Sequence, residues 1–253
     1  MGAMDSYRYL ELLELDFARL RETGTRDLGA AVPSCPGWTA ADLLHHVGQV
    51  YLHKVETMRH NAWPKPWPPA PEPAEPAAYL DRGIAELRGE FSSREPGDKI
   101  LTWYEPDQTV GFWIRRMALE TVVHRVDAEL AAGESIAPIP DDLAVDGIDE
   151  LLVAFLVYVA GQWPEDLGDR LASSDGRAVS IVTGAEHWLV RPRASGVEVT
   201  RGGAVSEAAS SISGTPQDVL LWLWGRVDGE VLSFSGDAEL VERLRGLLKD
   251  ATQ

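Results

Sequence analysis

Four residues of this chain have the types and the spacing of metal ligands. His45 and His46 are adjacent in one segment, and Glu120 and His124 stand four residues apart in another. Residues four apart share one face of a helix, so Glu120 and His124 can point at a single ion. Two histidines and one carboxylate are the ligands of catalytic zinc sites that keep a coordination position open. The set indicates a metal enzyme without naming its reaction.

The two adjacent histidines cannot both face the same partner, because neighbouring helical residues differ by about 100° around the axis. His46 shares a side with the apolar Leu43 and Val47, whereas His45 lies on a more polar side. His46 is therefore the better inward candidate, and His53, which shares its face, remains a rival ligand. A Glu and a His one turn apart are also common on solvated or ion-paired helix surfaces. Spacing alone does not show whether these side chains converge.

Three further residues can support such a site. Asp127, three residues after His124, can hold the imidazole in one tautomer, and Arg116, four residues before Glu120, can pair with the carboxylate. Arg226 follows the end of a predicted helix in the second half of the chain. It either complements the helix dipole there or reaches a substrate carboxylate.

Composition excludes several classes of protein. Forty acidic against 23 basic residues give a formal charge of -17, which repels nucleic acid and anionic membrane surfaces. No segment approaches the roughly 20 apolar residues that span a bilayer, and the N-terminus has no basic region followed by an apolar core. The single cysteine, Cys35, excludes an internal disulfide and multi-cysteine metal sites. We expect a soluble, cytoplasmic protein with no nucleic-acid or membrane partner.

The first half of the chain is predicted to be helical. Thr39 and Asp42 have the spacing of a capping box that starts the helix carrying His46, and Gly133 ends the helix carrying the Glu-His pair. A proline-rich stretch, 62–76, cannot be helical and predicts an extended crossover, whose tryptophans either line a pocket mouth or pack the crossover on the bundle. The predicted helices are 7–23, 40–59, 77–91, 110–132 and 140–161.

The second half of the chain has shorter, alternating patterns that are typical of strands. This change of pattern predicts an α+β fold with two domains, a helical bundle over 1–162 and a small αβ domain over 163–253. The predicted strands are 178–182, 187–190, 196–200, 208–213 and 231–234. The predicted helices among them are 219–224, after a start signal at Thr215 and Pro216, and 237–248.

Both segments that carry the candidate ligands resemble one known family. VPSCPGWTAADLLHHVG, residues 32–48, is similar to the CPGW(S/T)xxDLxxHL opening of mycothiol-dependent maleylpyruvate isomerase-like proteins. FWIRRMALETVVHRVDAE, residues 112–129, resembles their second motif, RRxxxExxxHRxDAE, and 214–226 looks like part of their small αβ domain. The resemblance covers nearly the whole chain and identifies it as a member of the DinB-like metalloenzyme superfamily.

The resemblance implies a DinB-like four-helix bundle followed by a sterol-carrier-like αβ domain. It implies a divalent metal, usually zinc, held by His46, Glu120 and His124, and an active-site arginine at Arg226. The implied activity is mycothiol-dependent thiol addition to, or cis-trans isomerisation of, a small electrophile that bears a carboxylate. The implied partners are mycothiol and that electrophile, in a monomer or homodimer. The alternatives are a non-catalytic small-molecule carrier and a thiol-independent, metal-dependent hydrolase.

Overall fold

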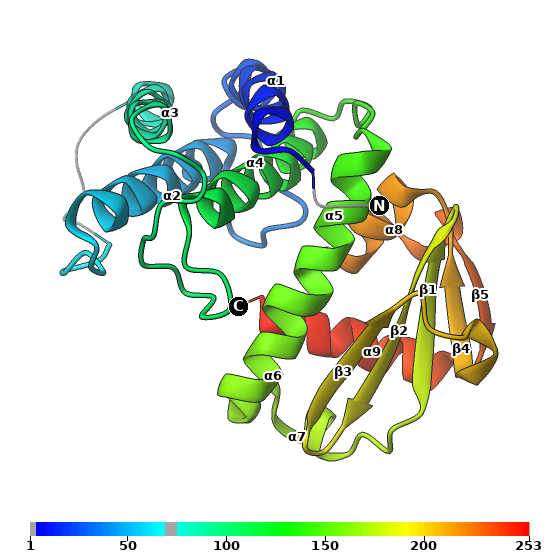
Figure 1. Cartoon of the computed structure of the whole chain (residues 1–253). Coiled ribbons are helices and arrows are strands. Elements are labelled where there is room, and N and C mark those ends of the chain that lie inside the picture. The colour runs from blue at the N-terminus through cyan, green and yellow to red at the C-terminus, as the bar shows by residue number, and fades with distance from the viewer. Residues whose placement is uncertain (1–3, 69–74, 253) are drawn as a thin grey trace. The chain divides into compact units, whose positions relative to one another are not determined.

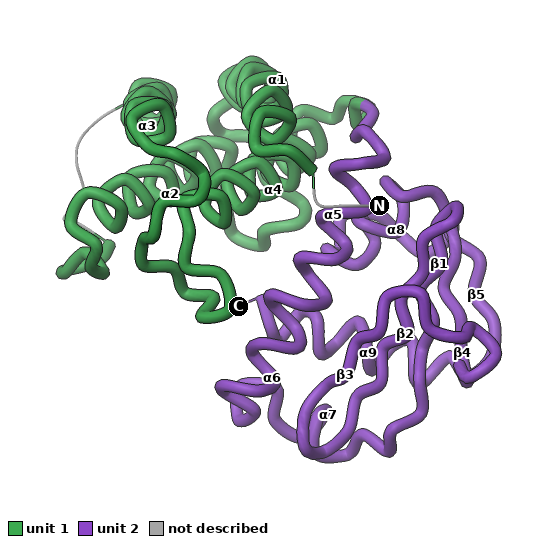
Figure 2. Tube along the Cα trace, viewed as in Figure 1, with its two compact units in different colours: residues 1–137 green, residues 138–253 purple. Residues whose placement is uncertain are grey.

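The computed structural model describes residues 4–68 and 75–252 (Figure 1). The chain divides into two units, residues 1–137 and 138–253 (Figure 2). The first is built of helices, and the second combines helices with one sheet, which confirms the predicted α+β class. No helix within the described ranges is long and apolar enough to cross a membrane.

Four long helices form the first unit, and each lies within two residues of its predicted bounds. α1 packs against α4 and α2 against α3, while α2 also contacts α4. α4 is buried around most of its circumference, as expected of a central helix. The helices are α1 (Ser6–Gly24), α2 (Ala40–His60), α3 (Pro76–Ser92) and α4 (Val110–Ala131).

Local sequence fixes where α2 begins and what it packs against. The backbone N–H of Thr39 donates to Asp42 Oδ2 over 2.8 Å, and the N–H of Asp42 donates to Thr39 Oγ1 over 3.3 Å, which completes the predicted capping box. Further along, Gly48 and Gly83 let α2 and α3 approach closely. A Cβ on Gly83 would lie 2.8 Å from the carbonyl oxygen of Gly48. α2 is therefore held closely against α3 while it also contacts α4.

The proline-rich crossover starts where α2 ends. Asn61 has the left-handed conformation, with φ of 47°, and closes the helix. Pro76 is the first residue of α3 rather than the last of the crossover, because a proline at the first helical position gives up no hydrogen bond. Residues 69–74 lie outside the described residues, so the extended conformation expected there is not tested.

The sheet of the second unit has the strand order β3-β2-β1-β4-β5. β1 and β4 are parallel, and all other neighbouring strands are antiparallel. α9 packs on β1 and β4, and α8 packs on β1. The elements are β1 (Ala178–Thr183), β2 (Glu186–Arg193), β3 (Gly196–Arg201), β4 (Ala208–Ser213), α8 (Pro216–Leu223), β5 (Ser233–Gly236) and α9 (Ala238–Ala251).

Two predicted elements of this unit differ in the structure. The strand expected at 231–234 begins only at Ser233, because Gly229–Val231 forms a 3-10 turn (η4) and the pairing with β4 aligns Phe234 with Ile212. The sequence pattern also missed several short helices, which have too few residues to show a period. These are η2 (Pro164–Leu167), α7 (Gly168–Ala172) and η3 (Val205–Glu207).

The division between the units lies at 137/138, whereas the change of pattern placed it at 162/163. The segment between these positions forms α5 (Asp141–Glu150), the π-helical η1 (Leu151–Val157) and α6 (Tyr158–Gln162). α5 packs on α8, η1 on α9 and β3, and α6 on β3. The segment thus belongs by its contacts to the second unit, although its helical pattern resembles the first.

Candidate metal centre

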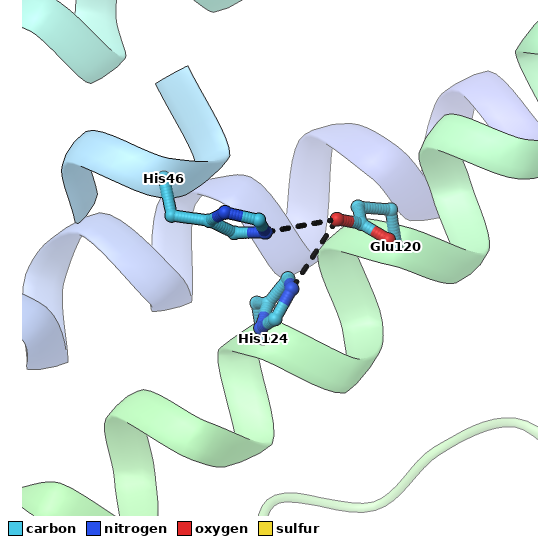
Figure 3. A group of neighbouring side chains, drawn as sticks. All are labelled: His46, Glu120 and His124. Carbon is cyan, nitrogen blue, oxygen red and sulfur yellow. Dashed lines mark ion pairs between the residues drawn. The ribbon is translucent and has the colours of Figure 1, made fainter. Parts of the chain in front are cut away.

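Three side chains from two helices of the first unit converge: His46 from α2, and Glu120 and His124 from α4 (Figure 3). One ligand atom of each lies within 4.8 Å of the others. Glu120 Oε1 stands 3.6 Å from His46 Nε2 and 3.2 Å from His124 Nε2. Two ligands of a tetrahedral zinc ion, each bonded at about 2.1 Å, stand about 3.4 Å apart. The donor types and these separations fit a divalent metal.

The set is reachable from solvent. The side chains of His46, Glu120 and His124 are 33%, 16% and 11% exposed. Their rings and carboxylate are nonetheless well supported, because the imidazoles of His46 and His124 meet edge to face at 5.1 Å between centroids. Trp38, which precedes the cap of α2, packs on His46 at 4.8 Å. A ligand can therefore approach a set whose geometry is held by packing.

A second layer of polar residues orients the set, and both contacts expected from spacing are present. Asp127 Oδ2 lies 2.8 Å from His124 Nδ1, and Arg116 Nη2 donates to Glu120 Oε2. With a proton on Nδ1 facing Asp127, His124 presents Nε2 to the set. With one oxygen taken by Arg116, Glu120 turns Oε1 towards both imidazoles.

Two partners of Asp127 were missed by sequence reasoning. The Ser34 hydroxyl donates to Asp127 Oδ1, and Cys35 Sγ lies 3.9 Å from Oδ2. Both residues lie in the CPGW segment, more than 90 positions from Asp127, so no periodicity links them. The only signal in the sequence for these contacts was that the chain carries both family motifs, 32–48 and 112–129. The structure shows that the segment helps to hold the carboxylate that orients His124.

Charge dominates the protonation of the set. Burial alone would lower the pKa of His124, but the charge of Glu120 and the hydrogen bonds to Asp127 and Glu120 raise it to about 9. Burial would raise the pKa of Glu120, yet Arg116 and His124 hold it well below its ordinary value. His124 is thus an imidazolium held between two carboxylates. A divalent cation held by these residues would take the place of that proton.

Two other histidines of α2, His45 and His53, lie apart from the set. His45 stacks on Tyr79, with 4.5 Å between ring centroids. His53 packs against Trp63 and Trp67 of the crossover, at 5.9 and 4.6 Å between centroids. The structure thus brings His46, the histidine favoured by helical phase, together with Glu120 and His124. The rival ligand, His53, is not part of the converging set. The two tryptophans close around His53 and connect the start of the crossover to α2.

Arg226 lies in the second unit, just after α8. Its Nη1 donates to the carbonyl oxygen of Trp224 over 2.6 Å, and its guanidinium lies 5.6 Å from the centroid of the Trp224 ring. These contacts suit an arginine that complements a helix C-terminus. Its role towards a substrate remains a prediction.

Comparison with known families decides the lineage. The family model described as mycothiol maleylpyruvate isomerase N-terminal domain matches residues 11–129, and the MDMPI C-terminal domain matches residues 142–243. The chain belongs to the mycothiol-dependent maleylpyruvate isomerase family. The N-terminal match contains all three converging residues, and the C-terminal match contains Arg226.

Solved structures share the fold of this isomerase-family chain. A crystal structure of a mycothiol-dependent maleylpyruvate isomerase superposes with a TM-score of 0.63 at 15% identity, over 94% of this chain and 97% of that one. A single-residue mutant of a mycothiol-dependent maleylpyruvate isomerase gives 0.60 at 14% identity, over the same shares. No curated protein matches the chain in sequence. At these identities, the structural likeness establishes the fold alone.

Proposed function

We propose that this chain is a metal-dependent enzyme that uses the thiolate of mycothiol to add to, or to isomerise, a small electrophile that bears a carboxylate. The observation that carries the proposal is the convergence of His46, Glu120 and His124 inside the N-terminal family match. We propose zinc as the metal, because two imidazoles and one carboxylate are its usual donors in catalytic sites. The proposed setting is the cytoplasm, where a thiol cosubstrate stays reduced.

The metal supplies one chemical property: when bound beside a thiol, its charge lowers the thiol pKa from about 8.5, so that thiolate is present at neutral pH. The protein residues set up that property. With a divalent metal bound, Glu120 would bring the single negative charge among the three ligands, which would leave a net positive centre for an anionic sulfur. Asp127 keeps the Nδ1 proton of His124 in place, and Arg116 restrains the second oxygen of Glu120.

The isomerisation reaction requires a nucleophile that both adds and leaves. The thiolate sulfur forms a bond to one carbon of the conjugated cis double bond, and the π electron pair of that double bond moves towards the neighbouring carbonyl. The former double bond then rotates as a single bond, and elimination of the thiolate restores the trans alkene. In the addition reaction, protonation of the adduct replaces elimination. We propose that a cationic side chain holds the substrate during these steps, and Arg226 is the residue at the position that matches the family.

The test is turnover by metal-loaded protein given mycothiol and a panel of electrophiles that includes cis-enedioate keto acids. Mass spectrometry and chromatography follow conjugates and isomerised products. We expect product only when both metal and mycothiol are present, and loss of product in His46→Ala. His45→Ala is the matched control, since it removes the neighbouring histidine that stacks on Tyr79, and it should retain turnover.

Two outcomes contradict the proposal and point to the alternatives. Retention of a small molecule without conversion of any electrophile would favour a carrier. Conversion at the same rate without mycothiol would favour a thiol-independent hydrolase.

A further inference from the structure

Lys54 lies on α2, eight residues beyond His46, and its ammonium has aromatic rather than acidic neighbours. Its Nζ is 5.0 Å from the centroid of the Trp113 ring and 3.2 Å from Nδ1 of His53. Within residues 4–68 and 75–252, Lys54 forms no ion pair with a carboxylate. The side chain is only partly exposed, and Trp113 beneath it is fully buried.

An unpaired, half-buried ammonium is unusual in so acidic a protein. The chain has 40 acidic residues, and its buried cations near the site are paired: Arg116 with Glu120, and Arg125 with Asp16. Burial of a charge without a counter-ion is costly, and the face of one aromatic ring offsets only part of that cost. An anion brought to Lys54 would therefore recover interaction that the protein itself does not supply.

The contact with Trp113 of α4 places Lys54 towards the helix that carries Glu120 and His124. Eight residues along α2 correspond to about 12 Å, and a helical side chain leans towards the N-terminus, which here is the direction of His46. On α4, Trp113 precedes Glu120 by seven residues and so lies on nearly the same face. The charges of Glu120 and Arg116 both act on Lys54. The converging set and the contact of Lys54 with Trp113 therefore lie along the facing sides of α2 and α4.

The protonation states suit an anion site. Burial and the charge of Arg116 lower the pKa of Lys54 to about 8, against the opposing effect of Glu120, so the ammonium persists at pH 7. Burial and the charge of Lys54 lower the pKa of His53 to about 4, so His53 is neutral and its Nδ1 can accept one N–H of the ammonium. The other N–H groups of Lys54 can donate to a ligand.

We propose that Lys54 binds the carboxylate of the electrophile within the helical unit, and so selects carboxylate-bearing substrates. The inference rests on the proposed function, whose substrate it narrows to a small anion that extends from the metal centre towards Trp113. Charge-assisted hydrogen bonds from the ammonium would hold the carboxylate. The rings of His53, Trp63 and Trp67 would limit its size. In this assignment, a cation for the substrate is already present in the unit that carries the candidate metal ligands.

The test uses maleate, a small cis dicarboxylate, as the probe in calorimetric titrations of the full-length protein without thiol. We expect Lys54→Met to weaken maleate binding about ten- to a hundredfold, the range for a lost hydrogen bond to a charged group. Lys54→Arg should restore much of the affinity. Lys99→Met is the matched control, because Lys99 is exposed in the same unit and should leave binding unchanged. Dimethyl maleate, which has the same skeleton without charge, should bind wild type and Lys54→Met equally.

A second measurement does not depend on the folding of a variant. The chain has four lysines, at 54, 65, 99 and 249, so ¹³C-methylated wild-type protein should give a simple lysine NMR spectrum. Maleate should shift the resonance that is missing from Lys54→Arg. Equal maleate affinity of wild type and Lys54→Met, or shifts confined to the other lysines, would overturn the inference.

Zinc content separates this inference from the proposed function. If Lys54→Met keeps zinc but binds maleate as tightly as wild type, the inference fails while the metal centre stands. If wild type binds no zinc, but Lys54→Met binds maleate more weakly than wild type does, the proposed function fails while the anion site stands.

Discussion

Zinc binding to this centre is expected to displace a proton from His124. The imidazole lies between Glu120 and Asp127. Burial lowers the pKa of His124, but the two carboxylates outweigh burial and raise this pKa to about 9. A metal ligand must be unprotonated, so zinc and this proton compete for His124. Because the pKa is raised, the apparent zinc affinity should increase as pH rises towards 9 and level off above it.

The size of the change in zinc affinity follows from the difference between the pH and the pKa of His124. At pH 8, one unit below the pKa, about nine-tenths of His124 is protonated, and each unit corresponds to about 1.4 kcal/mol. Zinc binding at pH 7 should thus be about a hundredfold weaker than its limit at high pH. Calorimetry in buffers of different ionisation enthalpy, at pH 7 and pH 8, counts the protons released. We expect close to one from His124 at both values.

The variant Asp127→Asn tests whether the proton released on zinc binding comes from His124. Loss of the carboxylate removes a charge and a hydrogen bond that raise the pKa of His124, so fewer protons should be released at pH 8. The proton count is the decisive readout, since the affinity also falls when the imidazole loses its orienting partner. Asp42→Asn, in the cap of α2, is the control and should release as many protons as wild type. A zinc affinity that is the same at pH 7 and pH 8 would refute the reasoning.

Two predictions concern the helices that carry the site. Gly83→Ala should destabilise the protein by about 1–3 kcal/mol in urea unfolding, because its Cβ would press on the backbone of Gly48. Gly89→Ala, on the same helix with nothing within 4 Å, should instead stabilise it by about 0.5–1 kcal/mol; equal effects of the two would contradict the packing of α2 on α3. Thr39→Ala should cost about 1 kcal/mol through loss of the cap of α2, whereas Thr39→Ser, which keeps the hydroxyl, should cost much less. An unchanged unfolding midpoint for Thr39→Ala would show that the capping box contributes nothing.

The sequence predicted the helices of the first unit because their determinants are local. The apolar period, the capping box at Thr39 and the proline and glycine boundaries are each readable within a few residues. Helical phase also separated His46 from His45, since that choice depends only on the neighbours along α2. The pairings of Arg116 and Asp127 with the Glu-His pair followed from spacing within α4 in the same way.

Features that depend on contacts between distant segments were not predictable in this way. The approach of His46 to α4 and the position of Lys54 over Trp113 require the packing of α2 against α4. The hydrogen bond from Ser34 to Asp127 requires that the segment before α2 also lies against α4. The π-helical turn of η1 arises inside a segment whose apolar pattern reads as ordinary helix. The predicted boundary at 162/163 differs from the observed division at 137/138 for a related reason. The sequence pattern indicates that 140–161 is helical, but it does not indicate which unit that helix packs against.

The most direct test of the metal centre is the absorption spectrum of cobalt-substituted protein titrated with mycothiol. Cobalt(II) accepts the same donors as zinc and reports a coordinated thiolate by a charge-transfer band in the near ultraviolet. We expect this band to grow to saturation in wild type and in His45→Ala, and to be absent in His46→Ala and Glu120→Gln. Full cobalt occupancy with no such band at saturating mycothiol would contradict the proposal that His46, Glu120 and His124 hold a metal that activates the thiol.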